Sequence, residues 1–210
     1  GDLDRIEAAV AKTGMTVDGR IIGPPIQLET NQLMYRKDVF QKHNVKVPTT
    51  LAELEAAAKA LNGKPMADDG QPGFGFVARG KRAAATSVFS GYLHAMGAIW
   101  MTPSREPAFN SEDGIKAFEL YGRLLKQYGP PGSDNNHWYE ASSIMGQGKA
   151  AMYTEFDSIS ACVEDPEKSK VKGKMGYVMF PKGPGGKPGT MATVWGLGIP
   201  KNSKNPKAGW

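Results

Sequence analysis

The chain has 210 residues, of which 40% are hydrophobic and 22% charged, proportions that fit a globular protein with a real core. The formal net charge is +5, but the Lys and Arg residues are scattered rather than concentrated among aromatic residues, which argues against a nucleic-acid binder. No apolar run approaches the roughly 20 residues that a membrane-spanning helix needs.

The first part of the chain predicts helices around one long strand. Leu3–Lys12 has the apolar spacing of an amphipathic helix. Ile26–Tyr35 alternates apolar and polar residues and predicts a strand that enters a sheet. A short helix follows over Lys37–His43. Thr50 and Glu53 then form a capping-box pattern at the start of a further helix.

The middle of the chain predicts a strand and two helices. Phe74–Val77 is a short apolar run of strand character, and Thr86–Met96 is apolar enough for a buried helix. The segment Asn110–Asp113 is a helix start, and the helix ends at the Gly- and Pro-rich segment Tyr128–Gly132.

A helix–strand–helix unit is predicted over Trp138–Ser160. Gly146 ends the first helix, Ala150–Tyr153 forms the strand, and Asp157 or Ser158 caps the second helix. A polar turn after a strand is a common ligand site in open α/β sheets. An ordinary turn whose polar residues only cap the helix is the alternative.

The end of the chain predicts two strands, Met175–Phe180 and Thr193–Pro200, separated by a Gly- and Pro-rich loop. Asn202–Pro206 predicts the start of a helix, which would be too short within this chain to be stable by itself. We therefore expect the chain to be a piece of a longer protein. The single cysteine, Cys162, cannot form an internal disulfide, and its apolar helical surroundings predict a small core residue.

Residues that could carry chemistry are few. The chain has no G-x-S-x-G, P-loop or dinucleotide-binding motif, and its three histidines and Cys162 lack metal-ligand spacing, so we expect neither cofactor nor metal. Glu29, Glu155 and Asp157 could supply the carboxylate pair of a carbohydrate-active hydrolase, although nothing in their spacing brings Glu29 near the others.

A binding pocket is the other possibility. Sugars and polyols present hydroxyl groups at their edges and C–H groups on their faces, so their pockets combine charged hydrogen-bonding groups with flat aromatic rings. Residues of both kinds lie near the predicted strand ends: Gln27, Glu29, Asn31, Arg82, Trp100, Trp138, Glu155, Asp157 and Trp195.

Several motifs in order resemble the extracellular solute-binding proteins of bacterial ABC importers, of the carbohydrate-binding type (family 1). These are GRIIGPPIQLETNQLMYRKDVFQKH, VPTTLAELEAAAKAL, GFGF, FNSEDGIKAFELYGRLLKQYGPPG, GQGKAAMY and GLGIPKNSKNPKAGW. The resemblance covers nearly the whole chain.

The resemblance implies an α/β fold, the lobe of a type II periplasmic binding protein, with a mixed sheet flanked by helices. It divides the chain into residues 1–25, a remnant of the preceding lobe and the hinge entry, residues 26–199, the second ligand-binding lobe, and residues 200–210, a truncated returning segment. The amino-terminal lobe would be missing, and dimerisation could replace it.

The resemblance also implies the site residues. Glu29, Thr30 and Asn31 lie on the entering strand, while Thr193 and Trp195 match the returning strand near the hinge. Glu155 and Asp157 match the turn after the GKAAM-type strand. Arg82, which comes from the polar residues near the predicted strand ends and not from the resemblance, completes the predicted set. Phe156 and Ser158 depart from the family's usual small residue and aromatic residue, which places a standard sugar-stacking platform in doubt.

The implied function is binding of a carbohydrate or polyol between two lobes, without catalysis, followed by docking on ABC permease subunits. The implied location is the periplasm, or the cell exterior with a lipid anchor. A carbohydrate-active hydrolase and an isolated lobe that no longer binds ligand remain the alternatives.

Overall fold

The computed structural model of the chain describes residues 16–66 and 70–209. The helix expected over Leu3–Lys12 lies outside the described residues. The chain divides into two compact units: a smaller unit of Gly1–Thr30 with Ala192–Trp210, and a larger unit of Asn31–Met191. The lobe boundaries expected at 25/26 and 199/200 concern the whole protein and stay a prediction.

The smaller unit contains two antiparallel pairs of strands. β1 (Thr16–Val17) and β2 (Arg20–Ile21) are joined by Asp18 and Gly19, which both have positive φ, as a two-residue hairpin turn requires. The first half of β3 (Pro25–Arg36) pairs with β6 (Ala192–Gly196). A short helix, α8 (Pro206–Gly209), follows.

The larger unit is built on the second half of β3. From residue 31 onward this strand pairs antiparallel with β4 (Met152–Phe156) on one side and with β5 (Met175–Met179) on the other. Leu33 and Met34 are neighbours on β3, so they point to opposite faces, and both are completely buried. Both faces of this sheet are therefore covered.

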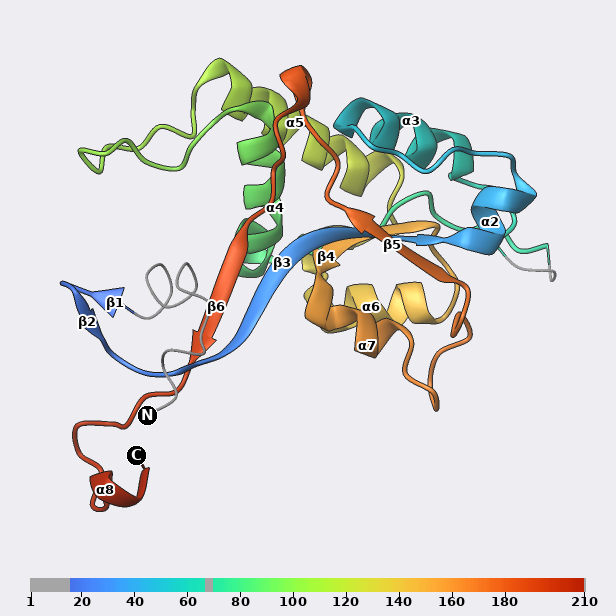
Figure 1. Ribbon diagram of the computed structural model, residues 1–210. Helices are drawn as coiled ribbons and strands as arrows, with labels where there is room; N and C mark the ends of the chain where they lie inside the picture. The colour runs from blue at the N-terminus through green and yellow to red at the C-terminus, as the bar shows by residue number, and fades with distance from the viewer. Residues whose placement is uncertain (1–15, 67–69, 210) are drawn as a thin grey trace. The chain divides into compact units, whose positions relative to one another are not determined.

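Helices cover the two faces, as the larger unit in Figure 1 shows. Leu33 belongs to a core shared with the helices α2 (Lys37–Lys42), α3 (Leu51–Leu61), α4 (Arg82–Met96) and α5 (Glu112–Gln127). Met34 belongs to a second core shared with α6 (Trp138–Gly146) and α7 (Ser160–Val163). Short 3-10 turns lie at Ser133–Asn135 (η2), Asp157–Ile159 (η3) and Pro184–Gly186 (η4).

The predicted α/β class is confirmed, with antiparallel ladders and parallel pairing only at isolated bridges in the described residues. The helix starts follow the predicted chemistry. Thr50 and Glu53 form the expected capping box of α3, and Ser111 accepts a hydrogen bond from the backbone N–H of Gly114 at the start of α5. The helix–strand–helix unit is present as α6, β4 and α7, but the strand runs over Met152–Phe156 rather than the predicted Ala150–Tyr153, so Thr154 and Glu155 belong to the strand and not to a turn.

Two local predictions are wrong. Phe74–Val77 is not a strand, because its backbone N–H groups bond to the carbonyls of two separate segments. Phe74 and Val77 donate to the carbonyls of Lys149 and Met152, whereas Phe76 donates to that of Tyr128, and only isolated bridges result. Cys162 is exposed and not a core residue, since α7 turns Val163 inward in its place. No helix among the described residues has the length and apolar character to cross a membrane.

Candidate functional site

The start of α4 and the start of α6 meet at the carboxyl end of β4 in the larger unit. The backbone N–H groups of Gly80 and Lys81 donate to the carbonyl of Asn136, at 2.9 and 3.0 Å, which ties the start of α4 to the start of α6. A Cβ atom on Gly80 would lie 2.1 Å from the carbonyl oxygen of Ser133, so only glycine permits this approach.

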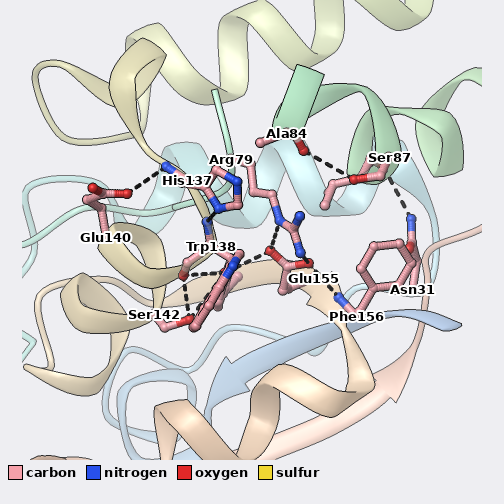
Figure 2. A network of polar contacts seen from close by, with 12 residues as sticks. Asn31, Arg79, Ala84, Ser87, His137, Trp138, Glu140, Ser142, Glu155 and Phe156 are labelled. Atoms are coloured by element: carbon pink, nitrogen blue, oxygen red, sulfur yellow. Dashed lines mark hydrogen bonds and ion pairs between the residues drawn. The ribbon is translucent and has the colours of Figure 1, made fainter. Parts of the chain in front are cut away.

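A buried ion pair joins these segments to the strand. The Arg79 guanidinium donates from Nε and Nη2 to the two carboxylate oxygens of Glu155, both at 2.6 Å (Figure 2). The Tyr153 hydroxyl and the backbone N–H of Phe156 donate to the same carboxylate, each at 2.9 Å. Glu155 is completely buried. Its carboxylate thus accepts four hydrogen bonds inside the protein.

Arg79 is fixed on several sides. Its guanidinium carbon lies 5.5 Å from the centre of the Phe156 ring, and the Tyr121 hydroxyl donates to its carbonyl at 2.5 Å. Burial alone would lower the pKa of Arg79, but the hydrogen bonds and charge of Glu155 outweigh it and raise that pKa. Two of the five N–H donors of the guanidinium are used by Glu155, while both N–H groups of Nη1 and one of Nη2 make no hydrogen bond within the described residues.

The tyrosines beside the pair act as neutral donors. Burial raises the pKa of Tyr153 well above its ordinary value, and the negative charge of Glu155 raises it further. Burial likewise raises the pKa of Tyr121. Both hydroxyl groups therefore keep their protons at physiological pH, and they hold Glu155 and Arg79 in place without adding charge.

The start of α6 adds aromatic rings to this region. His137 Nδ1 accepts from the backbone N–H of Trp138, and the Glu140 carboxylate accepts from the backbone N–H of His137, both at 2.8 Å (Figure 2). The His137 ring stacks on Tyr139, with ring centroids 5.2 Å apart and planes 16° apart. Tyr139 is exposed. A flat aromatic surface thus stands at the amino end of α6.

The predicted site residues of the smaller unit lie together on its strand pair. Glu29 is opposite Thr193 in the register of β3 and β6, and Trp195 donates from Nε1 to the Glu29 carboxylate at 2.7 Å. Glu29 is buried and Trp195 is exposed. The hydroxyl oxygen of Thr193 is buried and has no hydrogen bond within the described residues. Thr30 is opposite Ala192.

The predicted residues of the larger unit are not all together. Asn31 is opposite Phe156, and Gln32 is opposite Glu155, so Asn31 and Glu155 point to opposite faces of the sheet. The Asn31 amide donates to the carbonyl of Val88 in α4 at 3.3 Å. Its Oδ1 is buried and has no partner among the described residues.

Arg82 and Asp157 are nearer the surface. Arg82 is exposed and is the first residue of α4. Asp157 begins η3, and its carboxylate accepts from the backbone N–H of Ser158 at 3.0 Å. The prediction that Asp157 or Ser158 caps the next helix is wrong. The N-cap of α7 is Ile159, because the 3-10 turn is inserted first, and no side chain caps that helix.

The sequence reasoning missed Arg79 and its tyrosine partners. The available signals were a lone arginine directly after the apolar run Phe74–Ala78 and an acidic residue, Glu155, two residues after the predicted strand Ala150–Tyr153. No group of three or more His, Cys, Asp or Glu residues suited to a metal ion occurs in the described part of the chain.

Comparisons with known proteins agree on one family. The model of the family described as "Bacterial extracellular solute-binding protein" matches residues 2–210. A mannitol-binding protein of Pseudomonas aeruginosa is 30% identical over 197 residues, which are 92% of this chain and 44% of that protein.

Two solved structures of ABC transporter solute-binding proteins are similar to the structure of this chain. One, from Agrobacterium radiobacter K84 in complex with ribitol, has a TM-score of 0.88 and 31% identity, and covers 100% of this chain and 52% of its own. The other, from Agrobacterium vitis S4 with bound D-mannitol, has a TM-score of 0.81 and 30% identity. The match covers 92% of this chain and 46% of that protein's chain. The chain thus spans about half the length of the relatives it matches. It belongs to the family of bacterial extracellular solute-binding proteins.

Proposed function

We propose that the protein of which this chain is a part is the substrate-binding component of an ABC importer, and that it binds a polyol or sugar. The observation that carries this proposal is the likeness of the entire chain to a ribitol-bound solute-binding protein at 31% identity. The mannitol-binding relatives support the same class of solute.

The geometry at the end of β4 supports a hydroxyl-rich ligand. Arg79 keeps N–H donors that Glu155 does not use, and charged donors make strong hydrogen bonds to hydroxyl oxygens. The helices α4 and α6 both begin here, and their first backbone N–H groups favour oxygen atoms. The rings at the start of α6 offer the flat surface that C–H groups of a sugar prefer.

Glu155 takes a different role from the one predicted. With four internal donors and no exposed surface, it orients Arg79, and we propose Arg79 as the residue that contacts the solute. The same burial argues against a hydrolase that uses Glu155, because a general acid or base must reach the substrate. The other predicted ligand residues, Glu29, Thr30, Asn31, Arg82, Asp157, Thr193 and Trp195, stay predictions.

The mechanism we propose is closure of two lobes around the solute. A ligand that binds the closed form more tightly shifts the hinge equilibrium towards it, and the closed form then docks on the permease subunits. The protein would act outside the cytoplasmic membrane, in the periplasm or attached by a lipid anchor.

Calorimetry and thermal melting of the whole protein test the proposal, with ribitol, mannitol, maltose and an amino acid as ligands. A solute at 100 times its Kd should stabilise the protein by about 2.7 kcal/mol. A selective rise in Tm with a polyol or sugar supports the proposal. Absence of any rise, or release of a hydrolysis product, would contradict it.

Arg82→Ala tests the predicted site, and Arg105→Ala is its matched control. Both arginines are exposed and both have positive φ, at 43° and 66°, and because alanine keeps the Cβ atom, both variants retain the same kind of backbone strain. Loss of a charged hydrogen bond, worth about 1.5–3 kcal/mol, should weaken binding roughly 10- to 150-fold in Arg82→Ala. Equal affinities of the two variants would remove Arg82 from the site.

A further inference from the structure

The larger unit exposes a group of large apolar side chains between α4 and α5. Ile99, Met101, Phe109, Ile115 and Phe118 each expose between 38% and 60% of their surface. The Phe109 and Phe118 rings are 6.4 Å apart, and Phe118 stacks on the buried Phe89 at 4.3 Å. Large exposed apolar patches mark interaction sites.

The patch continues along one side of α5. Ile115, Phe118, Gly122 and Leu125 follow each other at spacings of three and four residues, so they form one stripe, which we call the outer face of α5. The buried residues of the same helix lie on the adjoining side: Gly114, Ala117, Leu120, Tyr121 and Leu124. Phe118 and Leu125 lie at the border between the two sides, since Phe118 stacks on Phe89 and Leu125 packs partly against the core. The described residues cover part of this stripe, but Ile115 and Phe118 still expose 52% and 46% of their surface, which leaves apolar area for a second neighbour.

Nothing in the fold of the described residues requires a glycine at position 122. A Cβ atom at this position would meet nothing within 4 Å, and glycine is a poor residue for a helix interior. A glycine on an exposed stripe does allow another backbone to come close. A hollow of about 330 Å³ extends the stripe past its end. Gly122, Leu125, Pro130 and Pro131 line it, together with the polar side chains of Lys126, Ser133 and Asp134.

We propose that the outer face of α5 is the docking surface for a helix from the part of this protein that lies outside the 210 residues. Relatives are about twice as long as this chain, so a segment of comparable length is available to cover it. The stripe from Ile115 to Leu125 is roughly 15 Å long, which matches about three turns of a packed helix.

The chemistry of the face favours this occupant over a permease or a second copy of the chain. The stripe contains no charged residue, whereas Lys116, Glu119 and Lys126 lie beside it. Permanent contacts resemble a domain core in this way, while transient interfaces are about as polar as ordinary protein surface.

Cysteine labelling of the whole protein tests the proposal. In a Cys162→Ser background, Phe118→Cys should react with a thiol reagent at least about 100-fold more slowly in the native protein than in urea, because only opening of the fold exposes it. The result should not depend on protein concentration. Met179→Cys is the control, since Met179 is 75% exposed and lies outside the patch.

Labelling of Phe118→Cys as fast as in urea would overturn the proposal. Protection that appears only as the protein concentration rises would identify a second copy as the occupant, and protection that needs added permease would identify the permease. Gly122→Ala provides an independent reading. Under a docked helix its methyl group clashes and lowers Tm, whereas on an open surface the better helix propensity raises Tm and contradicts the proposal.

Discussion

Glu155→Ala should destabilise the whole protein far more than the loss of a surface charge would. The variant removes the partner of Arg79, which is 9% exposed, and also the acceptor for the Tyr153 hydroxyl and the Phe156 N–H. Removing one member of a buried ion pair leaves the other charge uncompensated, at a cost of about 3–5 kcal/mol. That is a large part of a total stability of about 5–15 kcal/mol.

Glu55→Ala is the matched control. Glu55 accepts two hydrogen bonds from Arg123, at 2.7 and 3.1 Å, so its pairing resembles that of Glu155. The Glu55 and Arg123 side chains, however, are 26% and 41% exposed, and surface pairs contribute about 0–1 kcal/mol. Burial is therefore the main difference between the two variants.

Urea unfolding followed by circular dichroism measures both changes. We expect Glu155→Ala to lower the free energy of unfolding by at least about 2 kcal/mol more than Glu55→Ala does. The double variant Arg79→Met with Glu155→Leu should recover much of the loss, because it leaves no unpaired charge. Equal losses for the two single variants, or no recovery in the double variant, would refute the account of Glu155 as the orienting partner of Arg79.

Three further changes test other parts of the structure. Tyr121→Phe should cost about 1 kcal/mol in urea unfolding, because it removes the hydrogen bond to the carbonyl of Arg79, and an unchanged midpoint would show that this bond contributes nothing. Thr50→Ala should cost about 1 kcal/mol through loss of the α3 capping box, whereas Thr102→Ala, in an exposed turn, should change the midpoint less. Burial lowers the pKa of His94 below its ordinary 6.5, so the unfolded chain takes up this proton at a higher pH than the folded chain does. The free energy of unfolding should therefore fall as the pH falls below 6.5. His94→Gln should flatten that part of the pH profile, and an unaltered slope would exclude His94 as its source.

The sequence by itself predicted much of the local structure. The capping-box pattern at Thr50 and Glu53 and the start of α5 at Ser111 were predicted correctly, because caps depend on residues only a few positions apart. The strand over Ile26–Tyr35 followed from alternating side chains. Ordered motifs along the whole chain indicated the family, which the comparisons confirm.

The tertiary structure decided how the charged side chains are used. Whether Glu155 faces solvent or Arg79 depends on a contact between residues 76 positions apart, which no local pattern encodes. The alternation of strand side chains places Asn31 on the opposite face from Glu155, once the register with β4 is known. The sequence supplied the residue types and the class of protein, while packing determined which polar groups satisfy one another and which remain available to a ligand.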